Sequence, residues 1–241
     1  MFTYTIERGR LCNQIIRNLC VSIIAKKYNL KVSYSSCEKI KLLGIELFTG
    51  DNVYNNFTEL DDNNYFYILN KNTLNSNLNP NNSYFQTKEI TNFLYTHLHS
   101  IKDNIIAFNP YKERYNNNND CFIHIRLTDA SQHTPNLNYF LNTIKKLEFN
   151  KLYIATDDTS HDIIKNITSQ YELAEIVNLN DINTIQFGST CKNIILSQGT
   201  YSAMIGYLAF FSNVYYTVLD DANIWHGDIF SIPNWKYEPL V

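Results

Sequence analysis

Glycine, proline and arginine are scarce in this chain of 241 residues, and the scarcity of arginine restricts where an anion could bind. The 20 basic and 23 acidic residues give a formal net charge of −3. The chain therefore lacks the basic field by which nucleic-acid-binding proteins attract their partner, and we expect no nucleic-acid partner. The arginines are Arg8, Arg10, Arg17, Arg114 and Arg126, of which three lie in or beside one N-terminal loop.

The five cysteines are odd in number and scattered along the chain. Their positions match neither a disulfide framework nor a zinc-binding spacing, which is typical of a protein from a reducing compartment. The first ten residues do not form a basic stretch followed by an apolar one, so no secretion signal is predicted. The expected location is therefore cytoplasmic.

Three further absences exclude classes of protein. The longest apolar run, residues 201–219, is interrupted by Ser202, Ser212 and Asn213, so it is too polar to span a membrane. No Gly-x-Gly-x-x-Gly pattern follows a predicted strand, which argues against a Rossmann dehydrogenase. No Gly-x-Ser-x-Gly elbow is present, which argues against a serine hydrolase.

Alternating strand and helix patterns predict an α/β protein with parallel sheets. In the first half we expect strands at 2–6, 30–34 and 65–69 and helices at 14–28 and 90–105, with a short helix ending before Gly44. In the second half we expect strands at 121–126, 151–155, 174–177, 193–197 and 214–218, and helices at 137–147, 160–171, 181–187 and 201–211. Residues 111–120 are the expected linker, so the predicted domains are 1–115 and 116–241.

The most informative segment is the apolar strand that ends in His124, Arg126 and Asp129. Polar groups at the carboxyl end of a buried parallel strand emerge where open α/β sheets bind ligands. The planar guanidinium of Arg126 suits a diphosphate. The alternative is that Arg126 forms a structural ion pair with Asp129.

Two more predicted strands also end in polar groups, the first in Asp157 and Asp158 and the second in Ser197, Thr200 and Ser202. Because the carboxyl ends of parallel strands share one edge, we expect the three groups to converge on a nucleotide site without metal ligands. Alternatively, Asp158 and Ser197–Thr200 cap the helices that follow them.

These residues resemble motifs of the fucosyltransferase superfamily, and are closest to those of glycosyltransferase family 11, the α-1,2-fucosyltransferases. The opening Gly9-Arg10-Leu11-Cys12-Asn13-Gln14 is similar to the family's Gly-x-x-Gly-Asn-Gln. The other matching segments, in the family's order, are Ser83-Tyr84-Phe85-Gln86-Thr87-Lys88, His124-Ile125-Arg126-Leu127-Thr128-Asp129, Ala155-Thr156-Asp157-Asp158 and Ser197-Gln198-Gly199-Thr200-Tyr201-Ser202. Five motifs in one order form a specific signal, although each alone is weak.

The resemblance implies a GT-B-like fold, with two Rossmann-like halves whose parallel sheets face a central cleft. It also implies an inverting, metal-independent fucosyltransferase with GDP-fucose as donor, a glycan as acceptor and no cofactor. On this basis residues 1–115 form the acceptor side and residues 116–241 the donor side. Arg126 would hold the β-phosphate and Asn13 would lie near the sugar-phosphate. The other donor-binding residues would be Arg10, His124, Asp157, Asp158, Ser197, Thr200 and Ser202.

The chain departs from the family pattern at Cys12, where the family has its second glycine, and at Leu127, where it has a second arginine. Transfer also needs a base for the acceptor hydroxyl, and Asp129, His133 and Glu7 are candidates that the sequence does not rank. Two alternatives therefore stay open: a transferase that uses another nucleotide sugar, and a non-catalytic protein that binds a nucleotide or a glycan.

Overall fold

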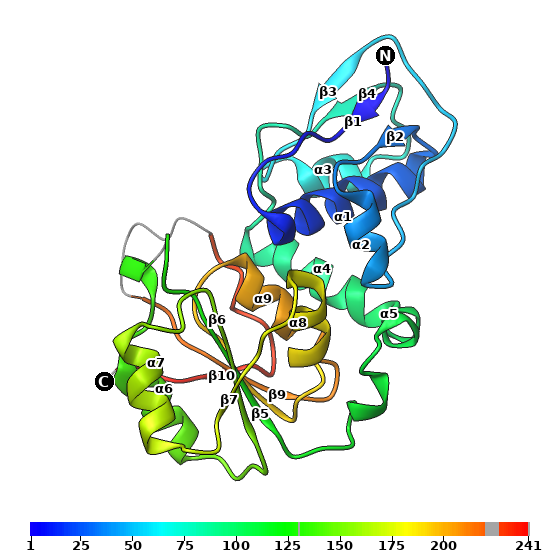
Figure 1. The fold of residues 1–241 in the computed structure, drawn as a ribbon. Helices are drawn as coiled ribbons and strands as arrows, with labels where there is room; N and C mark the ends of the chain where they lie inside the picture. Colours follow the sequence, from blue (N-terminus) through cyan, green and yellow to red (C-terminus); the bar gives the residue numbers. More distant parts are fainter. Residues whose placement is uncertain (130, 220–226, 241) are drawn as a thin grey trace. The chain divides into compact units, whose positions relative to one another are not determined.

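The structure is a computed structural model and describes residues 1–129, 131–219 and 227–240. The chain forms two compact units, which we call the N-terminal unit (Met1–His97 with Gly227–Ile229) and the C-terminal unit (Leu98–His226 with Phe230–Val241). Strands and helices alternate through both units, and all the pairs of strands described are parallel (Figure 1). The predicted α/β class with parallel sheets is confirmed.

The C-terminal unit contains a six-stranded parallel sheet of order β10-β9-β8-β5-β6-β7. Its strands are β5 (Cys121–Ile125), β6 (Leu152–Thr156), β7 (Glu175–Ile176), β8 (Asn193–Ile195), β9 (Asn213–Tyr216) and β10 (Lys236–Tyr237). Numbered from β5, this is the 3-2-1-4-5-6 order of a doubly wound sheet, in which the chain reverses direction across the sheet between β5 and β8. Ligands of such sheets bind at the carboxyl ends of the strands at this switch point.

Helices cover both faces of this sheet, with α6 and α7 on one side and α8 and α9 on the other (Figure 1). The helices of the unit are α5 (Lys102–Phe108), α6 (Leu137–Lys145), α7 (Asp162–Gln170), α8 (Asp181–Gly188) and α9 (Thr200–Tyr207), with short 3-10 turns η1 (Lys112–Arg114) and η2 (Ser131–His133). Every residue of β5 is buried, as expected for a strand covered on both faces. Ile123 and Ile125 pack in the core with α6 and α7, whereas Phe122 contacts Phe187 of α8.

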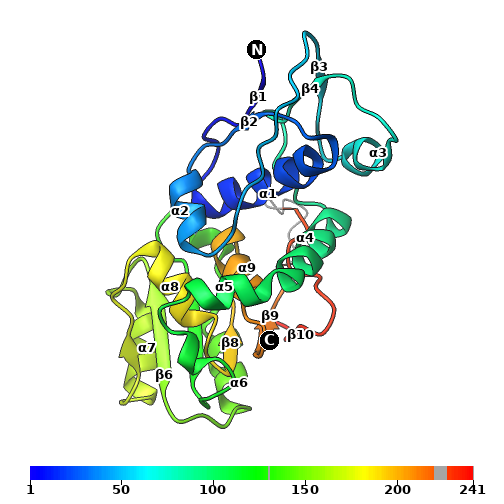
Figure 2. The ribbon, with the colours of Figure 1, turned by 90° about the vertical axis from the view of Figure 1, so that its right-hand side faces the viewer.

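The N-terminal unit contains two parallel strand pairs beside a long helix (Figure 2). Strand β1 (Thr3–Tyr4) pairs with β2 (Val32–Ser33), and β3 (Phe57–Glu59) pairs with β4 (Asn77–Asn79). The Thr3 hydroxyl accepts a hydrogen bond of 2.8 Å from the Leu78 backbone and so connects the pairs. The helices are α1 (Leu11–Tyr28), α2 (Cys37–Leu42), α3 (Tyr65–Asn70) and α4 (Lys88–Ser100), which continues into the C-terminal unit.

The predicted strand at residues 65–69 is wrong, because this segment forms helix α3. Aromatic and branched residues favour a strand locally. Tertiary packing overrides that preference, since a helical turn lets Tyr65 and Ile68 be buried together on one face. The short strands β3, β4 and β10 were not predicted, and the single helix expected at 90–105 is two helices, α4 and α5.

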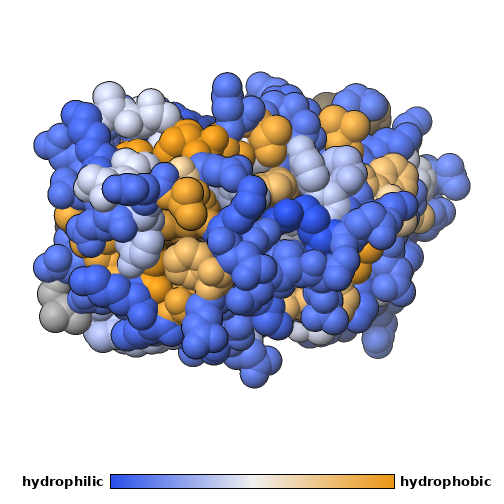
Figure 3. All heavy atoms as spheres, turned by 60° about the horizontal axis from the view of Figure 1, so that its bottom comes forward, coloured by the Kyte–Doolittle hydropathy of each residue, from blue (hydrophilic) through white to orange (hydrophobic). Residues whose placement is uncertain are grey.

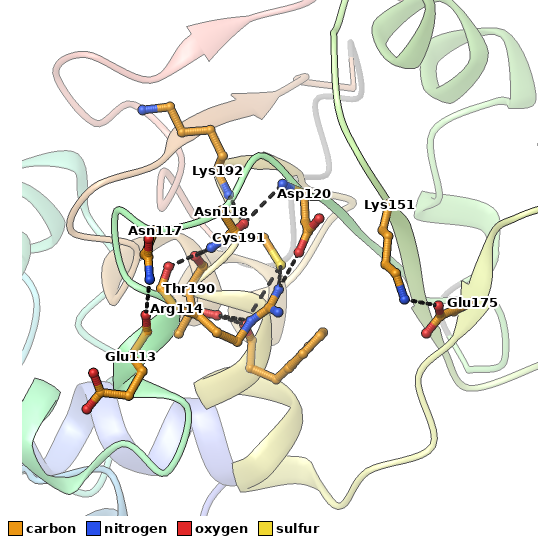
Figure 4. Close-up of polar contacts among 11 residues, drawn as sticks. Glu113, Arg114, Asn117, Asn118, Asp120, Lys151, Glu175, Thr190, Cys191 and Lys192 are labelled. Atoms are coloured by element: carbon orange, nitrogen blue, oxygen red, sulfur yellow. Dashed lines mark hydrogen bonds and ion pairs between the residues drawn. The ribbon is translucent and has the colours of Figure 1, made fainter.

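Residues 111–120 do not act as a linker between the units (Figure 4). The Arg114 guanidinium donates to Asp120 at 2.8 Å and to the Thr190 hydroxyl at 3.1 Å, and it lies 4.6 Å from the centre of the Phe187 ring. These contacts attach the segment to the amino edge of the six-stranded sheet. The two units therefore divide at His97 and Leu98 rather than after residue 115, where the sequence pattern places the boundary.

On the face drawn in Figure 3, apolar side chains lie in patches among hydrophilic ones. The edge strand β7 has both of its residues exposed, and Glu175 forms an ion pair of 2.7 Å with Lys151. A short edge strand that carries charge is poorly suited to pairing with another chain.

Across the described part of the chain, no helix is both long and apolar enough to cross a bilayer.

Candidate functional site

The predicted site residues of the C-terminal unit gather at the carboxyl edge of its sheet. Strand β5 pairs directly with β8, so the segments that follow these two strands are neighbours. The Ser197 backbone donates to the His124 carbonyl at 3.1 Å, and the Arg126 backbone donates to the Ser197 hydroxyl at 3.3 Å. His124, Arg126 and Ser197 thus lie together at the switch point of the sheet.

His124 is a buried neutral imidazole in a small polar cluster. Its Nδ1 lies 2.5 Å from the Ser202 hydroxyl, which is 3.5 Å from the Ser197 hydroxyl, and the Tyr201 ring lies against the imidazole. Burial lowers the pKa of His124 to about 4, with Asp157 opposing the shift and Arg126 adding to it. A neutral imidazole can hold Ser202 in place by a hydrogen bond. It has no positive charge with which to balance the charge of a bound anion.

The low pKa of His124 predicts a dependence of stability on pH. A histidine in the unfolded chain titrates near 6.5. Between about pH 6.5 and about pH 4 the unfolded state binds a proton that the folded state does not, so the free energy of unfolding falls as the pH is lowered through this window. We expect His124 to contribute about 3 kcal/mol to that fall. Urea unfolding at several pH values, compared with a His124→Asn variant, measures it.

His97 and His99 also have pKa values lowered by burial, but they are present in both wild type and variant. The difference between the two proteins in the pH dependence of the free energy of unfolding therefore reports on His124. An identical slope with pH in wild type and variant would show that folding does not lower the pKa of His124.

Arg126 forms a bidentate ion pair with Asp129. Its Nε and Nη2 donate to the two carboxylate oxygens at 3.0 and 2.8 Å, and the side chains are 15% and 45% exposed, respectively. The structure thus contains the ion pair that the sequence left as an alternative. Because this partly exposed pair contributes only about 0–1 kcal/mol, a bound anion could compete with Asp129 for the guanidinium. Of the other two candidate bases, His133 lies in η2 and Glu7 precedes α1.

The two aspartates after β6 have different environments. Asp157 accepts hydrogen bonds of 2.6 Å from the Leu127 backbone and from the Thr128 hydroxyl, so it holds the loop that follows β5. Burial opposes ionisation of Asp157, but these bonds lower its pKa below the usual value. Asp158 instead accepts from the backbone and the hydroxyl of Ser160. The cap of α7 is His161, so the alternative that Asp158 caps this helix is wrong.

Helix α9 begins at the same edge of the sheet, directly after β8. Its N-cap is Gly199, with φ 94° and ψ 164°, a conformation that other residues adopt only with strain. Glycine has no side chain with which to cap the first turn, so the capping role considered for Ser197 and Thr200 does not hold. Thr200 and Ser202 are buried in this first turn. The amino end of a helix presents N–H groups and a partial positive charge, which suit an anion.

Arg10 and Asn13 belong to the N-terminal unit, where the loop and helix α1 meet. Arg10 is exposed at the N-cap of α1, and Asn13 is the third residue of the helix. Asn13 is therefore not an N-cap, and its amide oxygen accepts from Gln86 at 2.7 Å. Cys12 lies inside the helix, where no positive φ is needed, so replacing the family's glycine does not strain the backbone.

Three residues that take part in these arrangements were not selected from the sequence. Gly199, Thr128 and Gln86 all lie within the segments that resemble family motifs. Their residue types alone did not distinguish them from the other residues of those segments. The available signal for Gly199 was its place between a buried strand and a helix in a chain with only seven glycines. In the described part of the chain, no group of three His, Cys, Asp or Glu side chains is arranged to hold a metal ion.

Comparisons with known proteins give a similarity of structure only. No protein-family model matches the chain. No curated protein sequence matches it. The solved structure of POFUT1 in complex with GDP aligns with 88% of this chain and 95% of its own, at 9% identity and a TM-score of 0.48. POFUT1 in complex with GDP-fucose aligns with 99% of this chain and 97% of its own, at 8% identity and a TM-score of 0.48. Values this low assign neither a family nor a residue role.

Proposed function

We propose that the chain is an inverting glycosyltransferase that moves a fucosyl group from GDP-fucose to a hydroxyl group of a glycan acceptor. The observation that carries the proposal is the placement of Arg126 and the amino end of α9 together at the β5–β8 switch point. A guanidinium beside backbone N–H groups and hydroxyls is the environment that a leaving diphosphate needs. The order of the motifs along the chain supports fucose as the transferred sugar.

In this mechanism the acceptor hydroxyl oxygen bonds to the anomeric carbon of the donor. The bond from that carbon to the β-phosphate oxygen breaks, and its electron pair leaves with GDP. Arg126 stabilises the charge that develops on the β-phosphate, and Thr200 and the first turn of α9 add hydrogen bonds. The acceptor proton passes to a base, for which Asp129, His133 and Glu7 are the candidates.

Phosphate binding at Arg126 would replace the bidentate pair with Asp129. The released carboxylate would then lie beside the reaction centre, which favours Asp129 over the other two candidate bases. Both oxygens of Asp157 already bind the loop at Leu127 and Thr128, whereas Ser160 bonds only Oδ1 of Asp158. We therefore assign to Asp158 the contact with the guanine edge or the ribose. His124, Ser197 and Ser202 support the phosphate-binding segments from within.

The proposal includes a GT-B fold, in which the N-terminal half is the acceptor side and the C-terminal half the donor side. Asn13 and Arg10 would meet the sugar-phosphate from the N-terminal side. It also includes catalysis without a metal ion, because one fixed guanidinium and a helix terminus would supply the charge that Mg²⁺ supplies in other transferases.

The test is nucleotide-dependent melting followed by turnover. GDP should raise the melting temperature more than UDP, because uracil lacks the paired N–H donors of guanine that suit a carboxylate. At 100 times its dissociation constant, a bound nucleotide stabilises the fold by about 2.7 kcal/mol. GDP-fucose with a mixture of glycan acceptors, in the presence of a chelator, should then release GDP.

Equal protection by GDP and UDP would favour a transferase with another nucleotide sugar. Protection by GDP without turnover would favour a non-catalytic binding protein. Activity that disappears with the chelator and returns with Mg²⁺ or Mn²⁺ would show a metal-assisted transferase instead.

A further inference from the structure

A chain of hydrogen bonds in the N-terminal unit ends on Asn13. The amide oxygen of Asn13 accepts from Nε2 of Gln86 at 2.7 Å. Gln86 is buried, with only 8% of its surface exposed. Asn13 lies in the first turn of α1 and Gln86 lies 73 residues later in the chain, so the contact is made by tertiary structure.

Gln86 is itself held by the carboxylate of Asp62. The Gln86 backbone donates to one oxygen of Asp62 at 2.9 Å, and the buried Ser83 hydroxyl donates to the other. Between Ser83 and Gln86 the fully buried Phe85 has φ 56°, an unusual conformation for a bulky residue. Burial raises the pKa of Asp62, and the bonds from Gln86 and Phe85 oppose that rise. The turn is thus held in a strained conformation by one carboxylate, and such strain is common at functional sites.

Two glycines make room for this arrangement. A Cβ atom on Gly9, which has φ 73°, would lie 2.6 Å from Nδ2 of Asn13. A Cβ atom on Gly227, which has φ 63°, would overlap the Gln86 carbonyl. The Asn13 amide is therefore packed closely against the Gly9 backbone, and the main chain of Gln86 is packed against Gly227.

We propose that Gln86 and Asp62 are positioning residues that hold the Asn13 amide in one orientation, with its oxygen toward Gln86 and its N–H donors available to a phosphate or sugar oxygen. This inference rests on the proposed function, in which Asn13 meets the sugar-phosphate. An amide can present either an acceptor or two donors, and an anionic ligand needs the donors. Gln86 donates to the Asn13 oxygen and so fixes the orientation in which the N–H donors face away from Gln86. Asp62 in turn holds Gln86 in position.

Double-mutant cycles test this chain of contacts. Asn13→Ala, Gln86→Met and Asp62→Ala are made singly, and each of the last two is combined with Asn13→Ala. We expect each single change to lower kcat with GDP-fucose by about tenfold or more. We expect Gln86→Met and Asp62→Ala to lower kcat no further in the Asn13→Ala background, because both act through the same amide. Circular dichroism corrects each rate for the folded fraction.

Ser76→Ala is the matched control. Ser76 is a buried residue of the N-terminal unit whose hydroxyl lies 2.6 Å from that of Thr58, so its loss also removes one hydrogen bond between side chains. It should lower the melting temperature without changing kcat, and it should lower the melting temperature by the same amount in the Asn13→Ala background.

Losses of kcat that multiply in the double variants, or wild-type rates in Gln86→Met, would overturn the positioning role. If the wild-type protein turns over no GDP-fucose, the proposed function fails separately. The same Asn13–Gln86 cycle is then measured as free energy of unfolding, where coupling between the two residues would support the fixed orientation and additivity would overturn it.

Discussion

Arg126→Ala should abolish transfer while leaving the fold intact. Removing one preorganised donor from a developing oxyanion lowers rates by about 10²–10³-fold, and loss of a full positive charge should do at least as much. Stability should change little, because the pair with Asp129 is partly exposed and contributes about 0–1 kcal/mol. Steady-state kinetics with GDP-fucose and a thermal melt measure the two effects.

Arg126→Lys should restore little of the activity. An ammonium group keeps the charge but cannot reproduce the two parallel N–H bonds that the guanidinium makes with Asp129 and would make with a diphosphate. Wild-type rates in the lysine variant would contradict the diphosphate role.

Arg114→Lys is the matched control for the arginine variants. Arg114 also pairs with an aspartate, at 2.8 Å from Asp120, but it lies at the opposite edge of the same sheet. Its guanidinium also bonds Thr190 and packs on Phe187, so lysine should lower the melting temperature there. The rate per folded molecule should stay unchanged.

Gly199→Ala should weaken both the fold and nucleotide binding. At φ 94° an alanine is strained, which costs about 1–3 kcal/mol of stability. Relief of that strain would move the first turn of α9, and with it the N–H groups proposed to face the diphosphate. We expect the melting temperature to fall and the dissociation constant for GDP, measured by calorimetry, to rise about tenfold or more.

Gly44→Ala is the control that separates the loss of stability from the loss of nucleotide binding. Gly44 also has a positive φ, 74°, and follows helix α2 in the N-terminal unit, so alanine is strained there too. It should lower the melting temperature without changing GDP affinity. If both variants bound GDP as tightly as wild type, the amino end of α9 would not be part of a nucleotide site.

The regular half of the fold was predictable from the sequence because its signals are local. Strands β5, β6, β8 and β9 are apolar runs between polar turns, and α6 and α7 show an apolar residue every three or four positions. The N-terminal half was less predictable. Strands β3 and β4 have only three residues each, too few for a period to be recognised, and their pairing depends on contacts far along the chain.

The candidate site was also predictable only in part. Polar residues at the carboxyl ends of apolar strands identified His124, Arg126 and Ser197, since the position of a strand end can be read from composition. Their hydrogen-bond partners could not be read in this way. Ser202 bonds His124 from 78 residues away, and Asp157 holds the loop at Leu127 from 30 residues away.

By itself, the sequence determined the α/β class, the alternating strands and helices from β5 to β9 and the residues that follow these strands, because these depend on the periodicity of neighbouring residues. Only the tertiary structure decided the strand order that places β5 beside β8, the ion pair of Arg126 with Asp129, and the contact of Asn13 with Gln86. Which side chains meet depends on how distant segments pack to bury apolar surface and satisfy polar groups. No local pattern encodes that choice.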